Sequence, residues 1–593
     1  MTLLLQMSPR CFVLILLCSL INAAEPAKLP NAGDPTAAFQ KLVADDWERG
    51  LVESPTRATW LGDKRFDDRW PDMSLPAIER RAKQREELLQ QIKAIVPTQL
   101  APMERLNYRL FRRQLEMEIA EFPFGLHLLP INQRDGIQDE HSIIDVIDFR
   151  TVKDYENWIA RLKAFPEYGR QTIALLREGK RRGIIHPQIV LRRLPAQIRQ
   201  QIVADPEKSP FYKPFHKMPD SIPNVTKVNL QENGYAYIQQ DIVPFYRELL
   251  DFIEKEYLPA GYEAVGAWQF PRGDEFYALR ARGFTTTSLT PDEIHDLGLR
   301  EVARIRTEME KVVKELDYKG SFAEFLQELR ADKKHYYTSS DELLAGYQVI
   351  SKRIDPQLPK LFKRLPRIPY GVEAIPMNIA PDTTTGYYRE PSTDGRRAGA
   401  FFVNLYRPEM RPKYEMEALT LHEAVPGHHL QIALASELTN LPMFRRQSSF
   451  TAFVEGWALY GESLGPELGC YKDPYSKFGQ LTYEMWRAVR LVVDTGMHHK
   501  RWTRDRAIVF FRDNTAKTEV DIVNEIDRYI AWPGQALAYK IGELKIRELR
   551  QRAEKKLGEK FDLREFHDVV LREGPVPLDV LEELVDAWIA EQK

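Results

Sequence analysis

The sequence predicts a mainly α-helical protein. Apolar residues recur at three- and four-residue spacing between charged ones in the segments 77–96, 291–316 and 340–358, which is typical of helices with one buried face. A start signal supports the second of these, because Thr290 is followed by Pro291 and then by two acidic residues. No repeat of 20–50 residues is visible in the chain, which argues against a solenoid.

Length and charge set the broad class. A chain of 593 residues with 43% hydrophobic residues can bury a large core. We place one domain at 25–593 and divide it at the proline-rich segment 204–223 into a helical N-terminal lobe, about 25–223, and a catalytic lobe, about 224–593. Because 84 basic residues face 86 acidic ones, no nucleic-acid partner is expected.

The first 24 residues are predicted to be a secretory signal peptide. Arg10 precedes an apolar run, 11–21, and small residues follow as far as Ala24, near which we expect cleavage. The run is too short to span a bilayer, so we expect a periplasmic or secreted protein without stable membrane insertion. A retained anchor is one alternative, and lipoprotein processing at Cys18 is another, although Leu17 stands where a small residue is usual.

One segment predicts a loop that leads into a strand. Residues 382–399 are rich in turn formers, and 400–406 is short, aromatic and β-branched. An edge strand can bind an extended substrate backbone by strand addition, and this segment, about 16 residues before His422, is placed to do so. An ordinary buried strand is the alternative interpretation.

The octet HEAVPGHH, residues 422–429, carries the candidate chemistry. Catalytic zinc takes three protein ligands and keeps one position open, and the usual motif supplies two histidines at positions i and i+4 with a Glu at i+1 as general base. Here Pro426 occupies i+4 from His422. We therefore expect His422 as a ligand, Glu423 as the base and a distorted helix between the histidines.

The second histidine ligand is predicted to be His428. Pro426 clashes with the carbonyl four residues back, and Gly427 tolerates unusual backbone angles, so a bulge that absorbs two residues would bring His428 to the i+4 place. His429 would lie roughly 10 Å further along an unbroken helix than His422. It stays an alternative ligand, or a residue that supports one.

A third ligand is expected from the run FVEGWALYGE, in which Glu455 and Glu462 share one helix face. Glu455 is the predicted ligand, and Glu462 would orient a ligand histidine or be the alternative ligand. The same region contains a G-x-S-x-G pattern around Ser463, but a nucleophile elbow needs a strand before the serine. Cys470, the one cysteine after the predicted signal, is expected to be an inert packed thiol.

Beyond these motifs, the chain resembles the bacterial domain of unknown function 885 family. The resemblance rests on HEAVPGHHLQ, FVEGWALYGE, VRLVVDTGMHHKRW (489–502) and EIDRYIAWPGQALAYKIG (525–542). That family is similar to the helical gluzincins, which include angiotensin-converting enzyme. The resemblance implies a large two-lobed zincin-like fold with a small β-sheet beside the metal helix and a deep central cleft, and it supports Glu455 as a ligand.

The resemblance also implies residues that stabilise an oxyanion. The relatives use a His or Tyr pair about ten residues apart, and Tyr529 and Tyr539 have that spacing here, with Arg528 adjacent. We favour Tyr539; His498 is a further candidate that could instead be structural.

In the loop, Tyr388, Arg396 and Arg397 could meet a substrate terminus, because arginine binds a carboxylate in a bidentate manner; alternatively they are surface residues.

The predicted function is a zinc metallopeptidase, with one Zn²⁺ per chain, that acts on short peptides. Two alternatives stay open: a metal-dependent amidase or esterase, and a helical binding protein with a structural metal. Four protein ligands would favour the structural metal, and three with an open position would favour catalysis.

Overall fold

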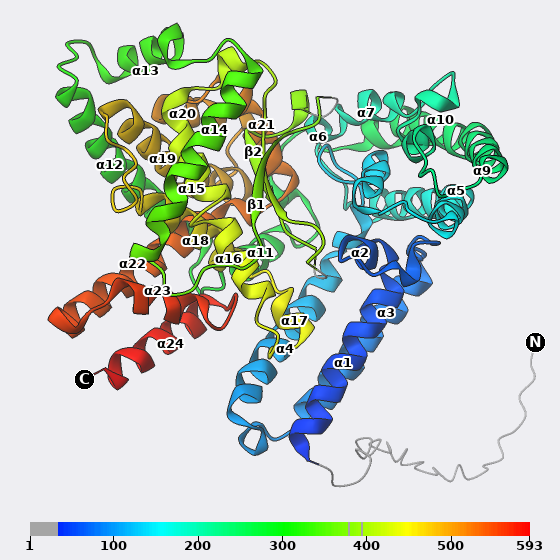
Figure 1. Cartoon of the computed structure of the whole chain (residues 1–593), viewed down its shortest axis with the longest axis horizontal. Coiled ribbons are helices and arrows are strands. Elements are labelled where there is room, and N and C mark those ends of the chain that lie inside the picture. Colours follow the sequence, from blue (N-terminus) through cyan, green and yellow to red (C-terminus); the bar gives the residue numbers. More distant parts are fainter. Residues whose placement is uncertain (1–33, 378–379, 393–394, 593) are drawn as a thin grey trace, which may run out of the picture.

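A computed structural model describes residues 34–592 except 378–379 and 393–394, so the predicted signal peptide lies outside the described residues. The chain is mainly helical with one small β-sheet, as Figure 1 shows. This confirms the predicted fold class at that level. None of the helices in the described ranges is long and apolar enough to cross a membrane.

The helices predicted from periodicity form with small shifts at their ends. The three segments correspond to α3 (Leu75–Lys93), α12 (Pro291–Glu315) and α14 (Ser340–Ile354). Helix α12 begins where the sequence predicts, because Thr290 and Glu293 form a reciprocal capping box. Helix α14 ends four residues earlier than predicted, since prolines follow it and the chain continues as a short 3₁₀ helix, Asp355–Lys360.

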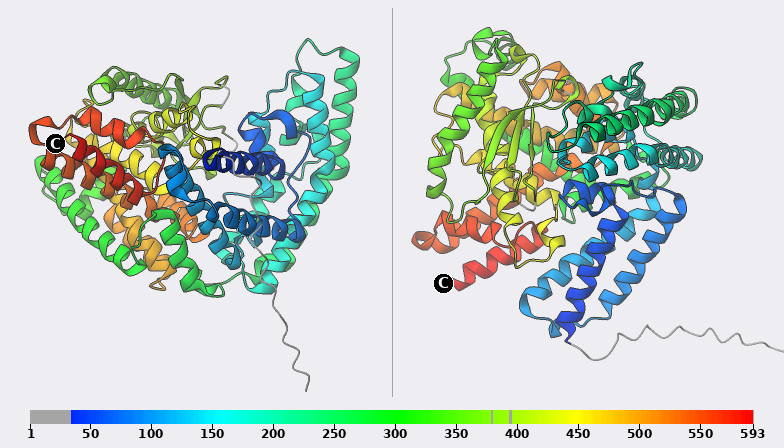
Figure 2. Two further views of the ribbon diagram at one scale, coloured as in Figure 1. Left: turned by 90° about the horizontal axis from the view of Figure 1, so that it is seen from below. Right: turned by 45° about the vertical axis from the view of Figure 1, so that its right-hand side comes forward.

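Buried side chains form two main hydrophobic cores. The smaller one is built from residues 131–257 together with Trp70, and the larger joins helices near the N-terminus to most elements after residue 265. Figures 1 and 2 show the helices of the smaller core together on one side of the molecule. These helices are α5 (Val152–Arg182), α7 (Leu194–Gln200), α9 (Asn224–Tyr237) and α10 (Val243–Phe252). The smaller core continues past residue 223; the division into lobes stays a prediction.

The larger core surrounds one long helix, α19 (Pro474–His498), which is buried along almost all of its length. Helix α12 packs along it, and α15 (Met416–Glu423), α18 (Thr451–Ser463), α20, α21 and α22 also contact it. The remaining long helices of this core are α1 (Pro35–Glu53), α4 (Pro102–Glu121), α11 (Gly273–Thr285), α20 (Arg504–Asn514), α21 (Glu519–Ala531), α22 (Ala538–Leu557), α23 (Leu563–Leu571) and α24 (Leu578–Glu591).

The sheet has the strand order β1-β3-β2. Strand β3 (Gly399–Val403) lies at the centre of the sheet and is fully buried. Strand β1 (Tyr370–Ala374) pairs with it in parallel and β2 (Gly386–Arg389) antiparallel. The predicted strand therefore exists, but the edge-strand interpretation of it is wrong and the buried-strand alternative holds. A second strand, β2, forms within the predicted loop and pairs with one edge of β3. Its two tyrosines are consecutive and so point to opposite faces of the sheet.

Candidate metal centre

The HEAVPGHH octet breaks a helix in two. Helix α15 (Met416–Glu423) ends at the glutamate of the octet and α16 (His428–Ser436) begins at its second histidine. The predicted distortion is thus a complete break, in which the His429 amide bonds back to the Ala424 carbonyl at 3.0 Å. Gly427 is required here, because a Cβ on it would lie 1.9 Å from the His422 carbonyl oxygen.

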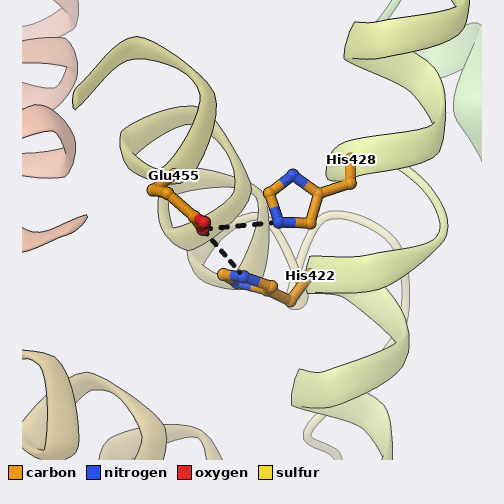
Figure 3. Close-up of side chains that lie close together, drawn as sticks. All are labelled: His422, His428 and Glu455. Atoms are coloured by element: carbon orange, nitrogen blue, oxygen red, sulfur yellow. Dashed lines mark ion pairs between the residues drawn. The ribbon is translucent and has the colours of Figure 1, made fainter. Parts of the chain in front are cut away.

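Three of the predicted ligand side chains meet across this break. Glu455 comes from α18 (Thr451–Ser463), and its Oε2 lies 3.5 Å from Nε2 of His422 and 3.4 Å from Nε2 of His428. Figure 3 shows the three side chains pointing at one another. One ligand atom of each lies within 4.8 Å of the others. The structure therefore brings His422, His428 and Glu455 together as one candidate metal-binding group.

Glu462 fixes the orientation of His422. This carboxylate is fully buried and lies two helical turns along α18 from Glu455, on the same face. Its Oε1 accepts a hydrogen bond of 2.8 Å from Nδ1 of His422. Arg487 of α19 holds the same oxygen at 3.2 Å. Because Glu462 holds Nδ1, the Nε2 atom of His422 faces Glu455 and is the atom that would bind a metal, as in metal-ligating histidines.

The electrostatics of the group favour an added positive charge. Burial by itself lowers the pKa of His422, but contacts with Glu455 and Glu462 outweigh it and raise that pKa to about 9. Burial likewise opposes ionisation of Glu455, yet His428 and His422 hold its pKa well below the usual range. Among the described residues the contacts of Glu455 Oε2 with the two imidazoles, at 3.4 and 3.5 Å, are ion pairs that do not have hydrogen-bond geometry. These residues fit a divalent cation, whose charge would replace the proton.

A close contact between two helices fixes Glu455. A Cβ on Gly456 would lie 2.5 Å from backbone atoms of Gly542 in α22, so the two helices touch through their backbones. Tyr539, one turn before Gly542, is thereby held near Glu455. Burial raises the pKa of this phenol, and the charge of Glu455 raises it further. Tyr539 stays protonated and can donate a hydrogen bond.

His429 points away from the group. Its Nδ1 lies 2.9 Å from the Tyr388 hydroxyl. The centroid of its imidazole ring lies 4.6 Å from that of the Tyr370 ring. Burial lowers the pKa of His429 to about 4, so the ring is neutral. The histidine is thus a contact between α16 and the sheet, and the break in the helix brings His428 rather than His429 to Glu455.

A pocket of about 380 Å³ opens onto the three candidate ligands. Glu423, the predicted base, lines it next to His422. One wall is formed by the segment Thr384–Tyr388, which includes edge strand β2, and another by α19, α21 and α22. Residues on these walls include the predicted Tyr388, Arg528 and Tyr539.

Other predicted site residues have structural contacts. The Tyr529 hydroxyl bonds to Trp486, Arg490 and Glu525 at 2.7–2.9 Å. His498 is fully buried, with Nδ1 3.0 Å from the Ala267 amide and Nε2 3.0 Å from the Tyr529 carbonyl. Neither of its nitrogens is left to meet a substrate, which corresponds to the structural alternative.

The loop arginines do not reach this pocket. Neither Arg396 nor Arg397 belongs to the described residues that line it. Arg397 contacts its own loop, where its amide donates to the Ser392 hydroxyl at 2.9 Å, and it lies close enough to Glu390 to influence the pKa of that carboxyl.

The two competing nucleophiles are inert. Ser463 lies in the last turn of α18 and donates to the Tyr460 carbonyl at 2.6 Å, so no strand precedes it as a nucleophile elbow requires. Cys470 is a free, buried thiol, and burial raises its pKa to about 11.

Sequence reasoning missed a group of charged residues in the pocket wall. Arg134, Arg487, Arg490 and Glu525 all line it. A signal existed for two of them, because Arg487 and Arg490 stand in an otherwise apolar stretch of a fully buried helix. Arg134 lies in a turn far from the motifs, and no local pattern identifies it.

The fold and this site define a mainly helical protein in which three helices bring two histidines and a glutamate together at a pocket. The chain belongs to the family described as "Bacterial protein of unknown function (DUF885)", which it matches over residues 55–585. No curated protein matches it.

Two solved structures share the fold. One is a proposed lipoprotein from Colwellia psychrerythraea, with a TM-score of 0.89 and 30% identity over 94% of this chain and 100% of that one. The other is a proposed lipoprotein of unknown function from Shewanella oneidensis, with a TM-score of 0.64 and 17% identity over 93% of this chain and 100% of that one.

Proposed function

We propose that this protein is a zinc-dependent peptidase that cleaves short peptides. The observation that carries the proposal is the meeting of His422, His428 and Glu455 where the pocket opens. The Oε2 atom of Glu455 lies 3.4–3.5 Å from the Nε2 atoms of the two histidines. Two His and one Glu are a common ligand set of hydrolytic zinc. The resemblance of the motifs to helical gluzincins supports the same chemistry.

The surroundings favour a catalytic over a structural metal. A structural zinc site is closed by four protein ligands. Both candidates for a fourth ligand are engaged elsewhere, His429 with Tyr388 and Glu462 with His422 and Arg487. The three remaining side chains line a pocket that a small molecule can enter.

The residues of the pocket can divide the work of hydrolysis. A bound zinc ion supplies Lewis acidity, which polarises a carbonyl group and lowers the pKa of water. Glu423 accepts a proton from the attacking water and passes it to the leaving amine. Tyr539 donates a hydrogen bond to the oxyanion that develops on the carbonyl oxygen. Burial in the pocket strengthens these interactions.

We further propose that the protein acts outside the cytoplasm. The two relatives are described as lipoproteins, and the expected signal peptide precedes the described residues. The mass of the purified mature N-terminus separates the two routes: a chain that begins after Ala24 indicates secretion, and a lipidated chain that begins at Cys18 indicates an anchored form.

The test of the proposed function compares wild type with Glu423→Gln and Glu455→Gln. We expect one zinc per chain by mass spectrometry in wild type and in Glu423→Gln, and loss of zinc from Glu455→Gln. On a peptide library, wild type should cleave and Glu423→Gln should be at least about 100-fold slower. Folded protein that takes up no metal after reconstitution would refute the site. Zinc binding without cleavage of any peptide would refute the peptidase and leave an amidase or esterase, or a binding protein with a structural metal.

A further inference from the structure

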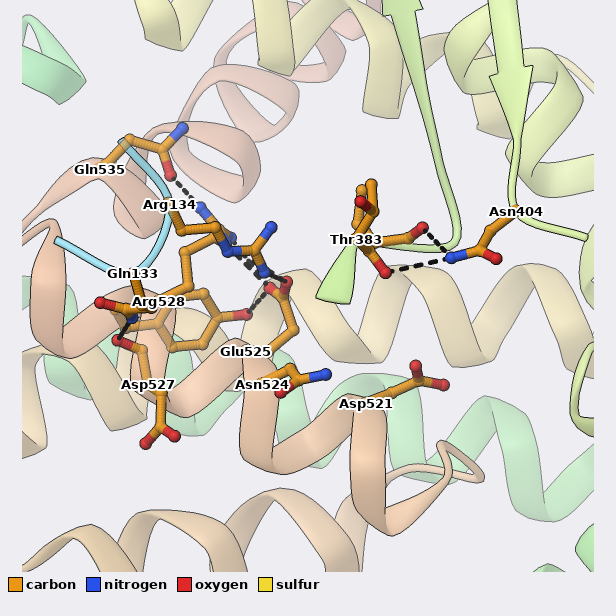
Figure 4. A network of polar contacts seen from close by, with 12 residues as sticks. Gln133, Arg134, Thr383, Asn404, Asp521, Asn524, Glu525, Asp527, Arg528 and Gln535 are labelled. Carbon is orange, nitrogen blue, oxygen red and sulfur yellow. Dashed lines mark hydrogen bonds and ion pairs between the residues drawn. The ribbon is translucent and has the colours of Figure 1, made fainter. Parts of the chain in front are cut away.

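Three arginines surround one glutamate in the pocket wall. Figure 4 shows Arg134 and Arg528 at the carboxylate of Glu525 in α21. The Nη2 atoms of Arg528 and Arg490 donate to Oε2 of Glu525 at 2.9 and 3.1 Å. The Nη2 atom of Arg134 lies 3.9 Å from the other carboxylate oxygen of Glu525, Oε1. All four side chains line the same pocket as the candidate metal ligands. We call these four residues the arginine cluster.

The cluster carries more positive charge than its own carboxylate can balance. Guanidinium groups stay protonated in proteins, so three charges share Glu525. Burial lowers the pKa of Arg134, and nearby Arg528 and Arg193 lower it further against the effect of Glu525. At Arg490 and Arg528 burial is outweighed by neighbouring tyrosines and Glu525, which raise the pKa, so Arg134 is the member whose charge is least balanced. Uncompensated buried charge is costly. A surplus of this kind is expected where an anion binds.

One guanidinium has a donor without a partner. Arg490 is only 4% exposed, and among the described residues its Nη1 has no hydrogen-bond acceptor, while its Nε and Nη2 are bound to Tyr529 and Glu525. Buried donors are rarely left unsatisfied in native proteins. A carboxylate in the pocket would satisfy it, since arginine and carboxylate match in geometry.

The cluster is held rigidly although its parts come from distant segments. The Arg134 amide donates to Asn132 Oδ1 at 2.7 Å in a tight turn, and the Gln133 side chain donates to the Asp527 carbonyl at 2.9 Å, which ties this turn to α21. Figure 4 shows Gln133 and Asp527 in contact. A binding group fixed in advance loses little entropy when it takes a ligand.

The cluster and the candidate metal ligands line one pocket. Arg487 contacts Glu462 behind His422, whereas Arg490, three residues further along α19, lies with its guanidinium 4.2 Å from the Tyr539 ring. A carboxylate bound at the cluster would therefore leave the rest of a short peptide in the pocket onto which the candidate ligands open.

We infer that Arg134, Arg490 and Arg528 form a carboxylate-binding subsite that takes the C-terminal carboxylate of a short peptide. This assignment rests on the proposed function for the cleavage, but the binding of a carboxylate can be measured without it. An acidic side chain carries the same chemical group, so the experiment includes it.

The experiment measures ligand binding by calorimetry on metal-free protein. Acetyl-Ala-Ala is compared as the free acid and as the C-terminal amide, and acetyl-Ala-Glu-amide supplies a side-chain carboxylate. Wild type should bind the free acid at least about tenfold more tightly than the amide, as expected for a charged hydrogen bond. Arg134→Gln should reduce that ratio to about twofold or less.

The matched control is Arg504→Gln. Arg504 also pairs with a carboxylate near the cluster, that of Asp527, but it does not line the pocket, so its loss should leave the ratio unchanged. Tight binding of the Glu-amide peptide would support the subsite and assign it to an acidic side chain. Equal binding of acid and amide by wild type, or an unchanged ratio in Arg134→Gln, would overturn the inference.

The inference and the proposed function fail separately. A preference for the free acid that depends on Arg134, in a protein that hydrolyses no peptide, upholds the subsite and refutes the peptidase. Cleavage of peptide acids and amides at equal kcat/KM, unaffected by Arg134→Gln, upholds the peptidase and refutes the subsite.

Discussion

Replacement of Glu462 by glutamine tests whether His422 binds a metal. The carboxylate is fully buried, accepts from the His422 Nδ1 atom at 2.8 Å and pairs with Arg487. Glutamine can still accept one hydrogen bond but loses the charge that makes the imidazole a stronger ligand. Such partners of ligand histidines contribute about 10–100-fold to metal affinity, or about 1.4–2.7 kcal/mol. The variant also leaves Arg487 buried without its partner, which we expect to cost about 3 kcal/mol of stability.

Zinc affinity is measured by competition with a chromophoric chelator, at a temperature where the variant is folded. Asp527→Asn is the matched control, because Asp527 is also a buried carboxylate paired with arginine, here Arg193 and Arg504, and is distant in sequence from the ligands. We expect the control to lose stability but to keep its zinc affinity. Glu462→Gln that binds zinc within about twofold of wild type would refute the assignment of His422 as a ligand.

Two further predictions concern the backbone and a buried acid. Gly427→Ala should destabilise the protein by at least about 2 kcal/mol and lower its zinc affinity, because the added Cβ would overlap the His422 carbonyl. Chemical denaturation measures the stability and the chelator assay the affinity. A variant with wild-type stability and affinity would contradict the close approach of the two backbones. Asp494 is fully buried, and burial raises its pKa to about 7. Between its ordinary pKa of 3.8 and about 7 the folded chain keeps a proton that the unfolded chain releases, so stability falls as pH rises, by about 4 kcal/mol in total. Asp494→Asn should therefore be more stable than wild type at pH 8, with the difference vanishing towards pH 4; a difference that does not change with pH would contradict this.

The sequence was sufficient to predict what depends on local pattern. Periodicity and capping residues predict α12 to within one residue, since both act within a few turns of chain. The strand at Gly399–Val403 was also predicted, but its place at the centre of the sheet was not. That place depends on β2, whose turn-rich sequence looks like a loop and becomes a strand only through pairing with β3.

The candidate ligands were predictable because their residue types stand in two short motifs. Pro426 and Gly427 indicate a distortion between the histidines, but only the packing of α15, α16 and α18 shows that the helix breaks and that His428 meets Glu455. The assembly of the arginine cluster was not predictable although Arg528 was named as a candidate, since Arg134 reaches the pocket through tertiary contacts that no spacing encodes.

The contribution of Arg134 has a consequence for attempts to shorten the protein. A truncated chain that starts after residue 223 would retain His422, His428 and Glu455, and so every candidate ligand. It would also separate α9 and α10 from α5, with which they share the smaller core, and would expose apolar surface to water. Such a chain would be prone to aggregation and would lack Arg134 in the lining of its pocket. A minimal metal-binding fragment therefore cannot stand in for the whole protein in activity screens, and half-length chains in this family should not be assumed to be functional.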